Sequence, residues 1–79
     1  MTLAEAIKYR FLELLGEKNL SISEAARKAD LSRATLNYAL YSKRSLNYSI
    51  KTVEAMARGT GVSMTEFFNS DLFENIDFV

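Results

Sequence analysis

Residues 22–41 constrain the fold of this chain most, because they predict a short helix, a tight turn and a second helix. Ser21 and Glu24 have the spacing of a capping box, which starts the first of these helices. Ser32 is a favourable N-cap for the second, which we place at about 32–41. A connection this short does not let two helices run side by side and antiparallel. The second helix therefore crosses the first steeply and projects outward.

The first helix of this pair runs to about Ala29, and its small residues Ala25, Ala26 and Ala29 leave little bulk on one side. We expect a neighbouring helix to approach it closely there. The second helix is expected to turn Leu36, Ala39 and Leu40 inward, because these positions recur at helical spacing.

Three further helices are predicted from similar signals. Thr2 with Glu5 forms a capping-box pattern for a helix that ends near Lys18, where Asn19 can adopt the left-handed conformation; Gly16 is an alternative end. Ser49 caps a fourth helix, and Ser63 with Glu66 opens a fifth. The apolar residues expected in the core are Leu3, Ile7, Phe11, Leu14 and Leu15, then Val53, Met56 and Ala57, and finally Met64, Phe67 and Phe68. The chain is predicted to be all-α, a compact five-helix bundle.

Composition limits the chemistry of the chain. Its 79 residues contain no Cys and no His, so the usual general acid–base residue and the usual zinc ligands are missing. We therefore expect no enzyme, no cofactor, no metal site and no small-molecule ligand. A signal peptide and a membrane span are not evident, which favours a cytoplasmic protein. The length suits one domain, placed at 1–69, followed by a tail at 70–79.

The net charge is zero, but the charges are separated along the chain. Residues 27–51 hold six basic residues against Asp30, whereas the residues after Arg58 are acidic without a base. This separation is compatible with one face docking on phosphate while the other stays solvated. The alternative is an ordinary surface on which the charges have no such role.

The tail combines acidic residues with apolar ones, namely Leu72, Phe73, Ile76, Phe78 and Val79. Such a segment is too apolar to remain in solvent. It either folds back over its own core or packs across a two-fold axis in a dimer.

The order of these elements, with Ala26, Leu31, Leu36 and Gly61-Val62-Ser63 at their positions, resembles the Cro/repressor-type (Xre, lambda-repressor-like) helix-turn-helix family over roughly residues 4 to 69. The resemblance implies that helices 2 and 3 form the helix-turn-helix. The chain departs from the family where Asp30 replaces the turn glycine, Ile22 replaces a polar residue, and Leu40-Tyr41-Ser42 follows the third helix.

The resemblance also implies that the third helix enters the major groove of double-stranded DNA. The expected base contacts are Arg33, Ala34, Asn37 and Tyr38, and the expected phosphate contacts are Ser32, Tyr41, Lys43, Arg44 and Ser49. Arg33 can bond guanine bidentately, Asn37 can pair adenine, and Ala34 can contact a thymine methyl. In the alternative, Arg33 is simply solvated, and Tyr38 and Tyr41 cover the edge of the bundle.

These contacts imply a sequence-specific transcriptional regulator, a repressor that binds its operator as a homodimer. A second hypothesis assigns the same fold to a protein-interaction module, such as an antirepressor or a partner-controlled subunit. Zero net charge slightly favours that second hypothesis.

Overall fold

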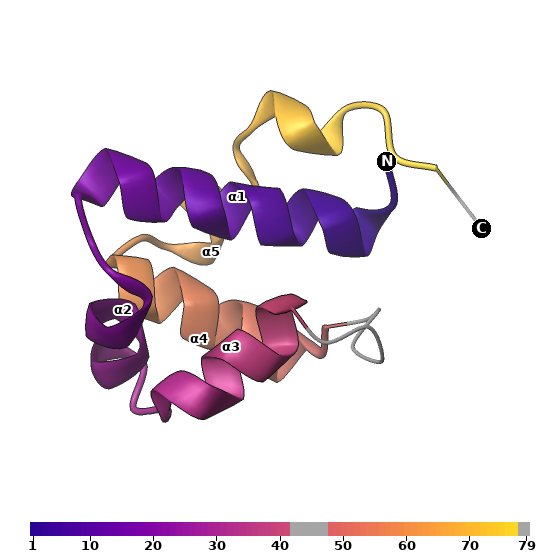
Figure 1. The fold of residues 1–79 in the computed structure, drawn as a ribbon. Helices are drawn as coiled ribbons and strands as arrows, with labels where there is room; N and C mark the ends of the chain where they lie inside the picture. The colour runs from indigo at the N-terminus through magenta and orange to yellow at the C-terminus, as the bar shows by residue number, and fades with distance from the viewer. Residues whose placement is uncertain (42–47, 78–79) are drawn as a thin grey trace.

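The computed structural model describes residues 1–41 and 48–77, and the regular structure within them is entirely helical (Figure 1). The elements are α1 (Leu3–Lys18), α2 (Ile22–Lys28), α3 (Arg33–Tyr41), α4 (Ile50–Thr60), α5 (Met64–Phe68) and a 3-10 turn, η1 (Asp71–Phe73). The predicted all-α fold with five helices is confirmed. No helix in the described ranges is long and apolar enough to cross a membrane.

Reciprocal side-chain hydrogen bonds start α1 and α2, as the capping-box patterns predict. The Thr2 N–H donates to Glu5 Oε1 (2.8 Å) and the Glu5 N–H donates to Thr2 Oγ1 (3.2 Å). Ser21 and Glu24 repeat the arrangement at 3.0 and 3.1 Å. Hydrogen bonds from the Thr2 and Ser21 backbones lower the pKa of Glu5 and of Glu24 below the ordinary value.

The end of α1 and the start of α5 agree with the sequence signals to different degrees. Asn19 ends α1 in the left-handed conformation (φ 55°), and Gly16 lies inside the helix. Ser63 accepts the Glu66 N–H at 3.0 Å, but the returning bond that would complete a capping box is not formed there.

The core receives side chains from all five helices, and its largest fully buried side chains are Phe11, Leu14, Leu36, Met56 and Phe67. Three predicted core residues are exposed instead: Leu3 at 50%, Phe68 at 40% and Met64 at 36%. Leu3 is the first residue of α1, at the end of the bundle, so few neighbours surround it. A helix of five residues makes little more than one turn, so α5 directs only Phe67 into the core.

Close approach between α2 and α4 confirms the role expected for the small residues of α2. Ala25, Ala26 and Ala29 are all buried. A Cβ added at Gly59 of α4 would lie 2.5 Å from the Ala25 carbonyl oxygen and 3.3 Å from the Ala29 Cβ. Glycine is therefore required at position 59 for α2 to rest on α4 at this distance.

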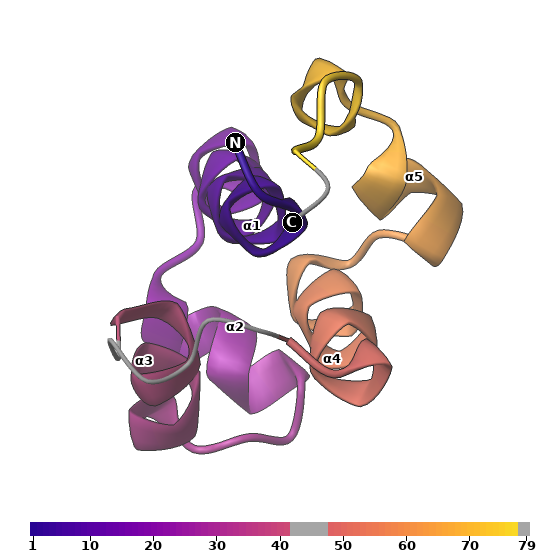
Figure 2. The same ribbon diagram turned by 90° about the vertical axis from the view of Figure 1, so that its right-hand side faces the viewer.

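The described part of the tail folds back over its own molecule. It runs along α1 on the side away from α3, as both ribbon views show (Figures 1 and 2). The ring centroids of Phe68 and Phe73 are 4.9 Å apart, and Phe73 packs against the core. The Asp77 N–H donates to the Met1 carbonyl oxygen at 3.0 Å, and the Asp77 carboxylate lies 3.0 Å from the terminal amine. Residues 70–77 thus pack on their own molecule in this single chain, and a role of the tail in a dimer stays a prediction.

Candidate nucleic-acid interface

The turn between α2 and α3 positions the outward-projecting helix. Asp30 has φ 58°, so it occupies the left-handed conformation that the turn requires. The Asp30 N–H donates to the Arg27 carbonyl oxygen at 3.1 Å, and the Leu31 N–H donates to the Ala26 carbonyl oxygen at 2.8 Å. These bonds satisfy the last carbonyls of α2 and reverse the chain within a few residues. Aspartate at position 30 thus preserves the helix-turn-helix geometry.

Ser32 starts α3 through hydrogen bonds to Thr35. The Thr35 N–H donates to Ser32 Oγ at 3.1 Å, and the two hydroxyl oxygens are 2.7 Å apart. Both side chains are exposed. The start of α3 therefore presents two hydroxyl groups and its first backbone amides to solvent, which suits contact with an anion.

Four of the nine side chains predicted to contact DNA are exposed on α3. Arg33 and Ala34 are exposed in the first turn, and Tyr38 and Tyr41 are 61% and 57% exposed further along. Asn37 is only half-exposed, because it lies next to the buried face of the helix. More than half of the surface of Tyr38 and of Tyr41 is thus open to solvent, and their contact with DNA stays a prediction.

The opposite side of α3 anchors the helix. Leu36 and Leu40 are 1% and 3% exposed, lie one turn apart, and belong to the hydrophobic core. Ala39, also expected inside, is partly exposed. Two buried leucines thus hold the exposed side of α3 in a fixed orientation, with Ala34, Tyr38 and Tyr41 at its centre.

Lys8 of α1 joins the C-terminal end of α3. Its Nζ lies 4.9 Å from the centroid of the Tyr41 ring, which is within cation–π distance. Neither Lys8 nor Thr35 was predicted as a site residue. The N3 position of Thr35 relative to Ser32 could have suggested that residue, whereas nothing in the local sequence connects Lys8 to Tyr41, more than thirty residues later.

Ser49 caps α4 rather than standing free. It accepts the Thr52 N–H at 3.1 Å and lies 3.0 Å from the Thr52 hydroxyl. Ser49 therefore precedes the first turn of α4, while Ser32 precedes the first turn of α3. The predicted phosphate contacts Lys43 and Arg44 lie outside the described residues.

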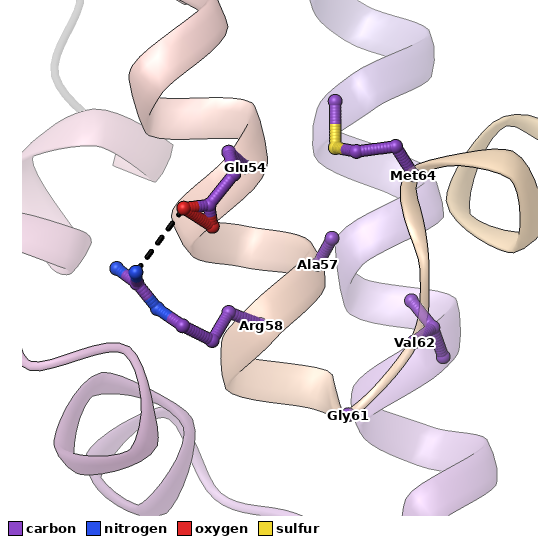
Figure 3. A pocket seen from close by; sticks show the side chains of 6 residues that line it. All are labelled: Glu54, Ala57, Arg58, Gly61, Val62 and Met64. Atoms are coloured by element: carbon purple, nitrogen blue, oxygen red, sulfur yellow. Dashed lines mark hydrogen bonds and ion pairs between the residues drawn. The ribbon is translucent and has the colours of Figure 1, made fainter.

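Arg58 of α4 contacts the helix-turn-helix at the end of α2. Its guanidinium donates to the Ala29 carbonyl oxygen at the end of α2 (2.9 Å) and to Glu54 (3.1 Å). The Glu54–Arg58 pair borders an open hollow of about 350 Å³, whose other lining residues are Ala57, Gly61, Val62 and Met64 (Figure 3). The hollow is made by α4 and the start of α5, so the exposed side chains of α3 take no part in it.

Comparisons with known proteins agree with this geometry. The helix-turn-helix family model HTH_3 matches residues 11–67. Two solved structures, of the wild-type restriction-modification controller protein C.Esp1396I and of a point mutant of it, are each 24% identical to this chain with a TM-score of 0.76. The similarity covers 94% of this chain and 93% and 92% of theirs, and it shows a shared fold. The comparison with curated proteins gave no match.

Proposed function

This chain belongs to the helix-turn-helix family HTH_3, a family of DNA-binding regulators, and we propose that it represses transcription by binding a specific operator through α3. The observation that carries the proposal is the division of α3 into a buried side and an exposed side. Leu36 and Leu40 fix the helix in the core, while Arg33, Ala34 and Tyr38 are exposed and free to meet base edges. We propose no catalytic role, and a cytoplasmic location.

Base recognition is proposed for the first two turns of α3. Arg33 donates two parallel hydrogen bonds to guanine, and Ala34 contacts a thymine methyl group. Asn37 pairs adenine through the part of its side chain that is accessible, and Tyr38 reaches a neighbouring base. A good bidentate pair discriminates against the wrong base by about 1–3 kcal/mol.

Phosphate recognition is proposed for the two ends of α3. At one end, Ser32 offers its hydroxyl and the amides that follow it. At the other, Tyr41 with Lys8 beside its ring, and Ser49 at the start of α4, face the DNA backbone. Lys43 and Arg44 are proposed from the sequence alone as the main cationic contacts.

We further propose that the operator is bound by a homodimer whose α3 helices enter successive major grooves roughly 34 Å apart. The tail lies on the opposite side of α1 from α3 (Figures 1 and 2). If two copies met through the faces that carry their tails, their α3 helices would point away from each other. We therefore propose that the dimer contact lies on another face of the bundle. The chain without residues 70–79 is then expected to remain a dimer in light scattering. A shift from dimer to monomer in a variant that is still folded would contradict this.

Selection of bound sequences from a random duplex pool tests the operator proposal, and a palindrome is the expected outcome. On the selected duplex, log affinity should fall linearly with log salt, by about 0.9 per neutralised phosphate. A response that is flat, or equal affinity for selected and random duplexes, would overturn the proposal.

Single substitutions test the residue roles. Arg33→Ala should reduce the preference for the selected sequence, with a smaller loss on random duplex. Lys43→Ala should weaken both alike and lower the salt slope by about one. Lys18→Ala, a charge change in the last turn of α1, is the matched control and should alter neither preference nor affinity appreciably. Equal losses on both duplexes for Arg33→Ala would remove Arg33 from base recognition.

A further inference from the structure

One surface of the molecule, outside the proposed DNA contacts, combines acidic and aromatic side chains. It consists of Glu66, Phe68, Asp71, Phe73 and Glu74, at the end of α5 and in the tail, and we call it the acidic aromatic surface. Phe68 is 40% exposed although its ring packs 5.3 Å from the buried Phe67 ring and 4.9 Å from the Phe73 ring. An aromatic side chain that is rigidly packed and still open to solvent is typical of an interaction surface.

Three carboxylates lie close to these rings in the sequence. Glu66, Asp71 and Glu74 are exposed, and no basic side chain of residues 1–41 and 48–77 forms an ion pair with any of them. The sequence after Arg58 contains no Lys or Arg. Residues 66–74 therefore combine an exposed aromatic ring with three exposed carboxylates that form no ion pair in the described part of the chain.

Repulsion of DNA does not explain these three carboxylates. α1 lies between the surface and α3 (Figure 2), and a helix with its side chains is about 10–12 Å across. Exposed charges are largely screened beyond about 8 Å at physiological ionic strength. The carboxylates are thus too far from bound DNA to influence its affinity appreciably.

We propose that the acidic aromatic surface docks a basic, amphipathic helical segment of a protein partner. An apolar residue of that segment would cover Phe68 and Phe73, while its Arg or Lys side chains pair with Glu66, Asp71 and Glu74. A cationic side chain can also lie over an exposed phenylalanine ring. Because the surface is separated from α3 by α1, the segment binds while α3 is engaged with DNA. The proposal goes beyond operator binding and does not depend on it.

The test uses a synthetic amphipathic peptide of Arg and Leu, titrated into the full chain and followed by amide chemical shifts. The expected perturbations cluster at residues 66–74, in the free protein and in its DNA complex. A peptide with Ser in place of Leu should bind at least tenfold more weakly. Perturbations spread over the acidic residues of the whole chain, or binding lost in the DNA complex even when the peptide is in excess over the DNA phosphates that capture it, would overturn the proposal.

A matched pair of variants separates a docking surface from general electrostatic attraction. E66Q/E74Q and E17Q/E54Q each remove two negative charges, the first pair within the surface and the second outside it. An exposed ion pair contributes roughly a two- to fivefold change in affinity, so E66Q/E74Q should weaken peptide binding by about fivefold and E17Q/E54Q by less than twofold. Equal weakening by both would overturn the proposal. Self-association of the free protein that E66Q/E74Q abolishes would also overturn the proposal, because a second copy of the chain would then occupy the surface.

DNA affinity measured on the same variants keeps the two proposals distinguishable. E66Q/E74Q should retain operator affinity within about twofold. Loss of peptide binding with intact DNA binding therefore bears on the docking surface alone, and absence of any operator leaves the peptide result unaffected.

Discussion

Substitution of Gly59 tests whether the close contact between α2 and α4 fixes the helix-turn-helix. In Gly59→Ala, the added Cβ would lie 2.5 Å from the Ala25 carbonyl oxygen, a backbone atom that cannot rotate away. The two helices must separate. Overpacking of this kind costs about 1–3 kcal/mol, and alanine returns up to about 1 kcal/mol through its higher helix propensity. Because the clash is with backbone, we expect a net loss of roughly 2 kcal/mol.

Gly16→Ala is the matched control, because a Cβ at position 16 meets nothing within 4 Å. It should stabilise the protein by about 0.5–1 kcal/mol through helix propensity alone. For a domain of this size 1 kcal/mol corresponds to about 4–8 °C in Tm. Thermal and urea unfolding should therefore show Gly59→Ala melting roughly 8–16 °C below the parent chain and Gly16→Ala melting a few degrees above it.

The same variant connects packing with DNA recognition. Since α3 follows α2 through a tight turn, displacement of α2 should shift α3 as well. At a temperature where Gly59→Ala is fully folded, its operator affinity should still fall severalfold, while that of Gly16→Ala stays unchanged. If Gly59→Ala is as stable as the parent chain, α2 does not rest on α4 as closely as described, and the reasoning fails.

Three further predictions concern α5, the end of α4 and acid stability. Arg10 is 6% exposed and donates to the carbonyl oxygens of Phe67 (2.7 Å) and Glu66 (2.8 Å). Arg10→Met should therefore lower the free energy of unfolding in urea by roughly 2–4 kcal/mol. An unchanged urea midpoint would contradict a role of Arg10 in holding α5. Gly61→Ala should cost about 1–2 kcal/mol, because Gly61 has φ 76° but open space around it, and equal Tm values would argue against strain. Because the pKa of Glu5 and that of Glu24 are lowered in the folded protein, their ionised carboxylates stabilise the fold at pH values above the ordinary glutamate pKa. This stabilisation is lost as the pH falls through the lowered pKa values. E5Q/E24Q should therefore flatten the acid side of the stability–pH profile, and an unaltered profile would contradict the assignment.

Helix ends were predictable because their signals are local. Thr2, Asn19 and Ser21 satisfy backbone groups within a few residues of themselves, so spacing alone locates them. Asp30 follows the same rule, since a short polar side chain tolerates the left-handed conformation. The fold class and the exposed side of α3 follow from these ends together with helical periodicity.

The remaining features depend on contacts between distant parts of the chain. Arg10 is charged yet buried, because the carbonyls that receive it come from α5, more than fifty residues later. Periodicity could not separate Phe67 from Phe68, since the decisive factor is how a single turn meets the core. Lys8 reaches Tyr41 only once α1 and α3 are packed. The position of the tail likewise depends on the folded surface of α1, which periodicity does not describe.

The stability of this helix-turn-helix and its DNA preference depend on different side chains of α3. Leu36 and Leu40 hold the helix in the core, and the tight turn and Gly59 fix α2 beneath it. Ala34 and Tyr38 are exposed, so the fold requires little of them beyond helix formation. Exposed substitutions of this kind usually change stability by no more than about 0.5 kcal/mol, whereas one base contact discriminates by about 1–3 kcal/mol. Operator preference can therefore change by substitution on the exposed side of α3 while the bundle that presents it stays intact.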